Sequence, residues 1–94
     1  SLPQYYCFRE KMNCMREEAY HVLKTLSEEE DGNIDSIDGV RIIMNDRSWV
    51  LIRPSNTENI IRISVEAKTE KTASTLMNRY KDKISKILKE GVKS

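Results

Sequence analysis

The segment 49–66, with the sequence WVLIRPSNTENIIRISVE, holds two arginines and two hydroxyl side chains close together. Arg53 ends a first apolar run and Arg62 lies early in a second, with Ser55 and Thr57 between them. If the chain turns between the two runs, both guanidinium groups and both hydroxyls can meet at one point. Planar guanidinium groups bind phosphate oxygens in pairs, and hydroxyls and consecutive turn amides add further donors. The segment therefore predicts an anion pocket suited to phosphate.

Asn56 lies in the middle of this turn. Asparagine tolerates a positive φ better than most non-glycine residues, so Asn56 is well placed for a left-handed backbone conformation. From the pattern alone, a plain hairpin turn with solvated ends explains the same residues equally well.

The residues Arg-Pro-Ser-Asn-Thr-Glu at 53–58, followed by Arg62, resemble the phosphate-binding loop of the α-D-phosphohexomutases. This family comprises phosphoglucomutase, phosphomannomutase and phosphoglucosamine mutase, and its loop commonly reads Arg-x-Ser-Gly-Thr-Glu-Pro with an arginine a few positions later. Asn56 stands at the glycine position, and an Asn form of the loop is familiar in the family. Asn59 stands at the proline position, which removes a φ constraint from the far side of the loop. The similarity extends over most of the chain and implies the last domain of such an enzyme.

The resemblance also implies a role for each residue of the loop. Arg53 and Arg62 would be charge-assisted donors to a phosphate, Ser55 and Thr57 hydroxyl donors, and Asn56 a backbone or amide donor. Glu58 would repel a phosphate, so we expect it to orient one of the arginines or to hold a backbone amide.

In the phosphohexomutases a phosphoserine on another domain donates its phosphoryl group to a hexose monophosphate, and a bisphosphate intermediate then reorients. The resemblance implies that this chain grips the phosphate that is not being transferred, so hexose phosphate and hexose bisphosphate are the expected ligands. Mg²⁺ is expected in another domain, and this fragment is expected to hold neither a metal nor a catalytic residue. Phosphomannomutase or phosphoglucomutase is the implied activity, with phosphoglucosamine mutase as the alternative.

Length and composition fit a piece of a larger enzyme. The chain has 94 residues and a net charge of +1, so it predicts one domain with no general attraction for nucleic acid or anionic membranes. It begins Ser1-Leu2-Pro3, without an initiating Met, a signal-like apolar core or a transmembrane run. We therefore expect an excised C-terminal domain, with residues 1–3 as a hinge and the other domains of the enzyme upstream.

The remaining chemically active side chains predict no second site. Cys7 and Cys14 lack metal-ligand spacing and lie in opposite strand phases, so we expect free thiols and a cytoplasmic location. His21 has no ligand cluster around it and is interpreted as a helix-surface residue. The acidic stretch 27–38 and the basic stretch 70–94 are interpreted as solvated faces.

Apolar periodicity predicts an α+β fold, with a four-stranded, mainly antiparallel sheet and two helices on one face. The order is a strand at 4–13, a helix at 15–30, strands at 34–45, 48–53 and 60–67, and a helix capped by Thr69 and ended by Gly91. The predicted buried positions are Tyr6, Phe8, Met12, Met15, Ala19, Val22, Leu23, Leu26, Val40, Ile42, Met44, Ile61, Ile63, Val65, Ala67, Ala73, Leu76, Met77, Tyr80, Ile84, Ile87 and Leu88.

Two other classes of function stay open on the sequence. The run Tyr5-Tyr6-Cys7-Phe8 places aromatic residues on a strand, loosely as in RNA-recognition domains, although the near-neutral charge argues against nucleic acid. A protein-interaction domain that uses the acidic stretch is the other alternative.

Overall fold

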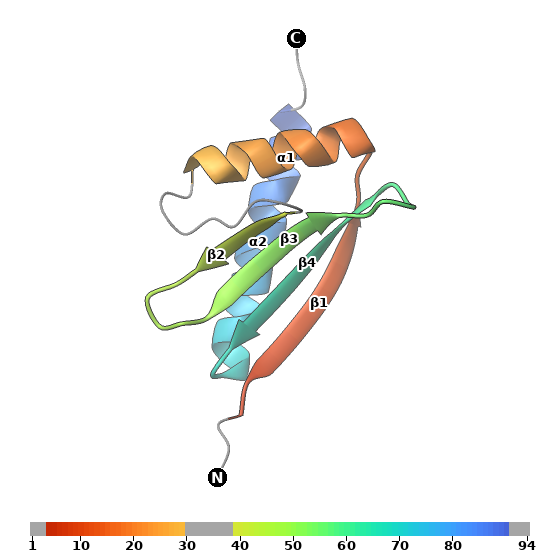
Figure 1. Ribbon diagram of the computed structural model, residues 1–94. Coiled ribbons are helices and arrows are strands. Elements are labelled where there is room, and N and C mark those ends of the chain that lie inside the picture. Colours follow the sequence, from red (N-terminus) through yellow and green to blue (C-terminus); the bar gives the residue numbers. More distant parts are fainter. Residues whose placement is uncertain (1–3, 30–38, 91–94) are drawn as a thin grey trace.

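A four-stranded sheet and two helices make up the part of the chain that the computed structural model describes, residues 4–29 and 39–90. In order, the elements are β1 (Tyr6–Asn13), α1 (Arg16–Glu29), β2 (Val40–Ile43), β3 (Trp49–Pro54), β4 (Ile60–Ala67) and α2 (Glu70–Glu90). The strands lie in the order β1-β4-β3-β2, and each neighbouring pair is antiparallel. Both helices pack on one face of the sheet (Figure 1). The predicted fold and element order are confirmed.

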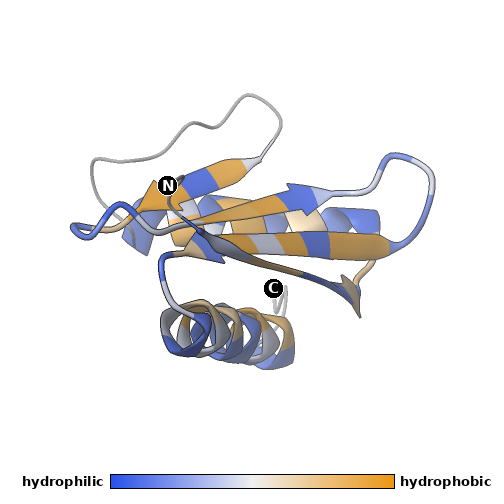
Figure 2. Ribbon diagram, turned by 90° about the horizontal axis from the view of Figure 1, so that it is seen from below, coloured by the Kyte–Doolittle hydropathy of each residue, from blue (hydrophilic) through white to orange (hydrophobic). Residues whose placement is uncertain are grey.

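Alternation along the strands separates a core face from an open face. On β4, Ile61 and Ile63 are fully buried, whereas Arg62 between them is exposed. Successive side chains of a strand point to opposite faces, so one face of the sheet becomes apolar and the other polar. Figure 2 shows this change of colour along the strands, with a helix lying under one face only. The two predicted arginines of the site are therefore kept out of the core.

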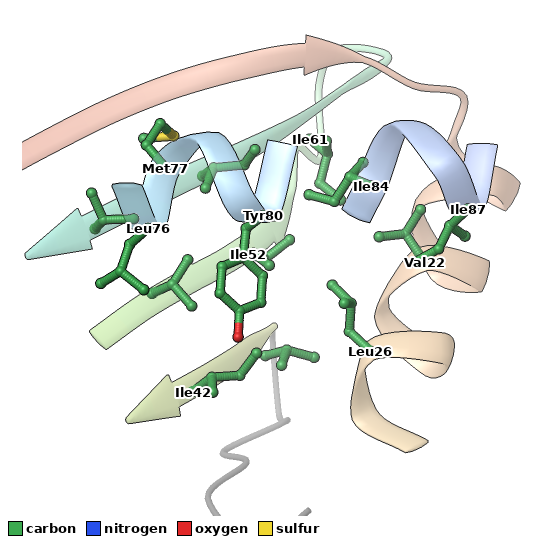
Figure 3. Packing of buried hydrophobic residues seen from close by; sticks show 14 of the residues in the cluster. Val22, Leu26, Ile42, Ile52, Ile61, Leu76, Met77, Tyr80, Ile84 and Ile87 are labelled. Atoms are coloured by element: carbon green, nitrogen blue, oxygen red, sulfur yellow. The ribbon is translucent and has the colours of Figure 1, made fainter. Parts of the chain in front are cut away.

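The core lies between the sheet and the two helices. Tyr80 of α2 is fully buried and its ring points toward the strand that carries Ile42 (Figure 3). Val22 and Leu26 of α1 close the other end of the cluster, where Val22 lies beside Ile87 of α2. Burying one large apolar side chain contributes about 1.5 to 3 kcal/mol, so this cluster is what holds the helices against the sheet.

Both helices begin with a capping interaction. The hydroxyl of Thr69 accepts a hydrogen bond from the amide of Thr72 at 3.1 Å, which confirms the predicted cap of α2. At α1, the amide of Met15 donates to Glu18 Oε1 at 3.0 Å, and the carbonyl of Met15 accepts the first helical bond, from Ala19. Met15 is thus the capping residue rather than a helical one. Its side chain is 56% exposed, so the prediction that it is buried is wrong.

The first strand is less covered than predicted. Phe8 and Met12 pack against the core, but Tyr6 is 37% exposed, so its prediction as a buried residue is also wrong. Tyr6 is the first residue of an edge strand and pairs with Ala67, the last residue of β4. It therefore lies at a corner of the sheet where neighbours are few.

Some boundaries differ from the prediction. The strand predicted at 34–45 is shorter, because β2 covers Val40–Ile43. Residues 34–38, the proposed hinge at 1–3 and the helix-ending Gly91 lie outside the described residues. Within the part of the chain that is described, neither helix is long and apolar enough to cross a membrane.

Candidate phosphate-binding site

The two predicted arginines face each other across the β3–β4 pair. Arg53 is the direct partner of Arg62 in the antiparallel register, and both side chains are exposed on the open face of the sheet. Like charges directly opposite each other on a sheet destabilise it, because their side chains start only about 5 Å apart. The pair becomes favourable when an anion lies between the two guanidinium groups. The register thus produces the convergence that the sequence predicts for these two residues.

Ser55 organises the loop between the two strands. Its hydroxyl oxygen accepts hydrogen bonds from the amides of Thr57, at 3.3 Å, and Glu58, at 3.2 Å. Its own amide donates to the carbonyl of Ile60 at 3.0 Å, which closes the loop at its base. A serine that bonds amides two and three residues ahead is a local turn-forming device. The loop is therefore held from within by the predicted hydroxyl.

This arrangement corrects the expectation for Asn56. The one non-glycine residue with a positive φ in the described chain is Arg47, at 72°, so Asn56 is not in the left-handed conformation. The loop does not need it, because the two bonds to Ser55 turn the chain without a left-handed residue. Asn56 and Thr57 are both exposed, at the outer end of the loop. The hydroxyls of Ser55 and Thr57 lie 3.5 Å apart.

Glu58 lies beside Arg62. Their closest atoms, Glu58 Oε1 and Arg62 Nη2, are 3.6 Å apart, and the two side chains are 55% and 59% exposed. An ion pair this exposed contributes little to stability, about 0 to 1 kcal/mol. Glu58 thus lies next to Arg62, and its role in orienting that arginine stays a prediction.

Two contacts anchor the loop to the start of α1, and the sequence pattern did not indicate either. Arg16 donates from Nη2 to the carbonyl oxygen of Asn56 at 2.8 Å, over 40 residues of sequence. The amide of Cys14 donates to the carbonyl of Asn59 at 2.9 Å. Figure 1 shows the loop and the first turn of α1 at the same end of the sheet. Periodicity cannot reveal such contacts, because they depend on how β1 and β4 pair.

Gly39, just before the neighbouring strand β2, lies against Arg53, and the sequence analysis also missed it. A Cβ atom at Gly39 would lie 2.5 Å from the carbonyl oxygen of Ile52 and 2.8 Å from Cγ of Arg53. The residue must be glycine because the backbone of β3 and the stem of Arg53 pass so close. Its signal in the sequence was weak, a single glycine just before an apolar run.

The open face of the sheet is hollowed next to the loop. A hollow of about 380 Å³ is lined by Arg53 and Arg62 at one end and by Trp49 and Glu66 at the other. Glu66 accepts from Trp49 Nε1 at 3.3 Å and from the thiol of Cys7 at 3.1 Å. The hollow therefore runs from a cationic end at the loop to a hydrogen-bonded end at the far side.

Neither thiol is activated as a nucleophile. The hydrogen bond to Glu66, and secondly burial, raises the pKa of Cys7. Burial, and secondly the nearby charge of Glu18, raises the pKa of Cys14. Both cysteines are free, as predicted. Across residues 4–29 and 39–90, no three His, Cys, Asp or Glu side chains come together as a metal site.

The aromatic run on β1 does not form a stacking platform. Phe8 packs against the core, and Tyr6 shares its strand phase, so these rings do not lie on the open face. Most of the acidic stretch proposed as a protein-interaction surface, residues 30–38, lies outside the described residues.

Comparison with known proteins finds relatives over most of the chain. Residues 12–83 match the family described as phosphoglucomutase/phosphomannomutase, C-terminal domain. A probable phosphoglucosamine mutase of Methanobrevibacter smithii is 39% identical over 97% of this chain and 21% of its own length. A phosphoglucosamine mutase of Methanococcus vannielii is 41% identical over 82% of this chain and 18% of its own length. A phosphopentomutase of Thermococcus kodakarensis is 37% identical over 98% of this chain and 22% of its own length.

The chain thus spans about a fifth of the length of these curated relatives. The family match covers β4, the loop and most of both helices, so it includes each of the proposed phosphate-binding residues. The chain belongs to the family of phosphoglucomutase/phosphomannomutase C-terminal domains.

Proposed function

We propose that this chain is the phosphate-gripping domain of a phosphohexomutase. Arg53 and Arg62 bind the phosphate group of the sugar that is not being transferred, and Ser55, Asn56 and Thr57 add hydroxyl and amide donors. Glu58 stays off the ligand and orients Arg62 through their ion pair. The observation that carries the proposal is the direct cross-strand pairing of Arg53 with Arg62 beside a loop of polar donors.

The sugar in this proposal is a hexosamine phosphate. Relatives in several organisms are named phosphoglucosamine mutase or probable phosphoglucosamine mutase, and these names favour glucosamine phosphate over the glucose and mannose phosphates expected from the loop alone. A relative named phosphopentomutase has similar identity over this domain. The domain grips a phosphate, a group that these substrates share, so we assign the choice of sugar to other domains.

The domain acts by positioning. A phosphate held at the loop fixes the far end of the substrate, so the reacting oxygen stays near the phosphoryl donor of another domain. The phosphoserine and the Mg²⁺ belong to other domains in this proposal, and no step of the chemistry is carried by the residues described here. Closure of the domain on the substrate would complete the site. Two free thiols fit a cytoplasmic location.

Kinetics of the longer enzyme test the proposal. Arg53→Ala should lower kcat/KM for glucosamine phosphate by about a hundredfold, because hydrogen bonds to a charged group contribute about 1.5 to 3 kcal/mol each. Phosphorylation of the donor serine should persist in the variant, since that residue lies in another domain. Arg79→Ala, an exposed arginine of α2 on the far side of the sheet, is the matched control and should keep wild-type kinetics.

If Arg53→Ala kept the wild-type kcat/KM, the proposal that this domain grips the phosphate would be wrong. A preference of the wild-type enzyme for glucose, mannose or pentose phosphates would correct the sugar and leave the role of the loop intact.

A further inference from the structure

A third cation lies next to the two arginines on the open face of the sheet, in a row of three that crosses adjacent strands. Lys11 of β1 is the direct partner of Arg62, on the opposite side from Arg53. Residues directly opposite in an antiparallel sheet point to the same face, so Lys11, Arg62 and Arg53 lie side by side on the open face across three adjacent strands. All three side chains are exposed.

This row is short of negative charge. Its one ion pair among the described residues is the exposed contact between Arg62 and Glu58. Neither the side chain of Lys11 nor that of Arg53 forms a hydrogen bond or ion pair with a described residue. Adjacent strands are about 4.8 Å apart, so the sheet places three positive charges within the span of one small ligand.

Two lysines elsewhere in the described structure are paired with carboxylates. Lys81 of α2 contacts Glu10 at 2.6 Å, and Lys86 contacts Asp82 at 3.5 Å. Glu10 is next to Lys11 in sequence but points to the opposite face of β1, as strand alternation requires. It is therefore held by Lys81 and cannot neutralise the row.

The surface beside the row has room for a ligand. Lys11 and Arg62 line one hollow of about 280 Å³, together with Arg9 and Ser64. Arg53 and Arg62 line the adjoining hollow of about 380 Å³, so Arg62 lies where the two meet. An anion bound at Arg62 can be reached from both sides.

We propose that Lys11 is a third phosphate-binding residue, which contacts the same phosphate monoester as Arg53 and Arg62. This inference rests on the proposed function. A phosphate monoester carries a charge of about −1.5 to −2 at pH 7, and the three cations of the row, with Arg9 lining the same hollow, supply the positive charge to balance it beside the one flanking carboxylate. The guanidinium groups fix the orientation of the phosphate, and the ammonium group adds a flexible point charge. Such a charge can follow the phosphate when the sugar is bound in either direction.

Titration of the 94-residue chain with inorganic phosphate, followed by two-dimensional NMR, tests this assignment. Lys11→Gln should weaken binding by about three- to tenfold, the range between an exposed ion pair and a charge-assisted hydrogen bond. Lys11→Arg should restore affinity to within about twofold of wild type, since it keeps the charge and the reach. Lys68→Gln is the matched control, because Lys68 is exposed just past the far end of the same strand as Arg62, and it should bind as wild type does.

The Lys11 side-chain methylene next to the ammonium should also shift on titration, and that of Lys68 should not. Equal affinities for Lys11→Gln and Lys68→Gln would overturn the assignment while leaving the Arg53 and Arg62 site in place. Loss of binding in Lys11→Gln without rescue by Lys11→Arg would overturn it as well, because the charge would not be the cause. If wild-type chain shows no phosphate-dependent shifts at Arg53 or Arg62, the proposed function fails together with this inference.

Discussion

Strand β3 has a tight turn at one end and a longer loop at the other, and the two use their polar groups in opposite ways. In the β2–β3 turn, Asp46 accepts hydrogen bonds from both the hydroxyl and the amide of Ser48, and Arg47 takes a left-handed φ of 72°. The amide of Met44 donates to the carbonyl of Ser48 at 2.8 Å and completes the hairpin. Two polar side chains of this turn, Asp46 and Ser48, are therefore bonded to each other within the turn.

The β3–β4 loop leaves polar side chains available. Ser55 holds two backbone amides, but Asn56 and Thr57 remain exposed and the side chain of Arg53 contacts no described hydrogen-bond or ion-pair partner. Besides the bonds of Ser55, the loop is held by contacts from outside it, from Arg16 and Cys14. A turn that only reverses the chain can satisfy itself, whereas a turn that binds a ligand must be held by other elements. Residues that hold the β3–β4 loop should therefore affect phosphate binding, and residues that hold the β2–β3 turn should not.

The largest effect is expected for Gly39→Ala. The new methyl group would meet the carbonyl of Ile52 and the stem of Arg53, and overpacking of this kind costs about 1 to 3 kcal/mol. We expect a lower free energy of unfolding in a denaturant titration and weaker phosphate binding, because Arg53 must move. Wild-type stability together with wild-type affinity would show that Gly39 does not set the position of Arg53.

A smaller effect is expected for Arg16→Ala. Loss of the bond to the carbonyl of Asn56 should weaken phosphate binding by about threefold, since one hydrogen bond contributes about 0.5 to 1.5 kcal/mol net. Calorimetric titration with phosphate measures it. Lys24→Ala, an exposed cation on the same helix, is the control. Equal affinity in the two variants would mean that the loop holds its shape without α1.

The smallest effect concerns pH and the closed turn. The hydrogen bond from the Ser48 hydroxyl, with the Ser48 amide next, lowers the pKa of Asp46. A carboxyl whose pKa is lower in the folded state stabilises the fold above its unfolded pKa, and that contribution is lost as the pH falls through the folded pKa. In Ser48→Ala the pKa of Asp46 should rise toward its ordinary value, as measured by NMR of the carboxyl carbon. Phosphate affinity at pH 7 should not change. A large change in that affinity would mean that the β2–β3 turn contributes to phosphate binding and is not separate from the β3–β4 loop.

Local pattern was enough for the fold. The core was predicted from the period-two alternation of Ile61, Ile63 and Val65 and from the long apolar stripe on α2. Apolar residues that repeat with the period of a strand or a helix lie on one face, and that face is the one that becomes buried. The errors at Tyr6 and Met15 come from context: one lies at a corner of the sheet and the other caps a helix. Spacing along the chain does not show which end of a strand is covered.

The site was predicted only as far as the loop residues themselves. The sequence predicted that a turn between two strands could bring Arg53 and Arg62 together, and the register pairs the two residues directly. Arg16, Gly39 and Lys11 reach the site through other strands and a helix, so they depend on the sheet order β1-β4-β3-β2. The absence of a left-handed Asn56 depends in turn on two hydrogen bonds to one serine.

Phosphate titration of the isolated chain, read residue by residue from amide shifts, tests the central claim most directly. The shifts should cluster at Ser55, Asn56, Thr57 and Glu58. The dissociation constant should be on the millimolar scale, which is a binding free energy of about −4 kcal/mol, and binding should weaken as salt rises. The Arg53→Ala, Arg62→Ala double variant should stay folded and lose nearly all of these shifts. Shifts that centre on Tyr5 to Phe8 or on the exposed face of α2, and that persist in the double variant, would contradict a phosphate-binding loop between β3 and β4.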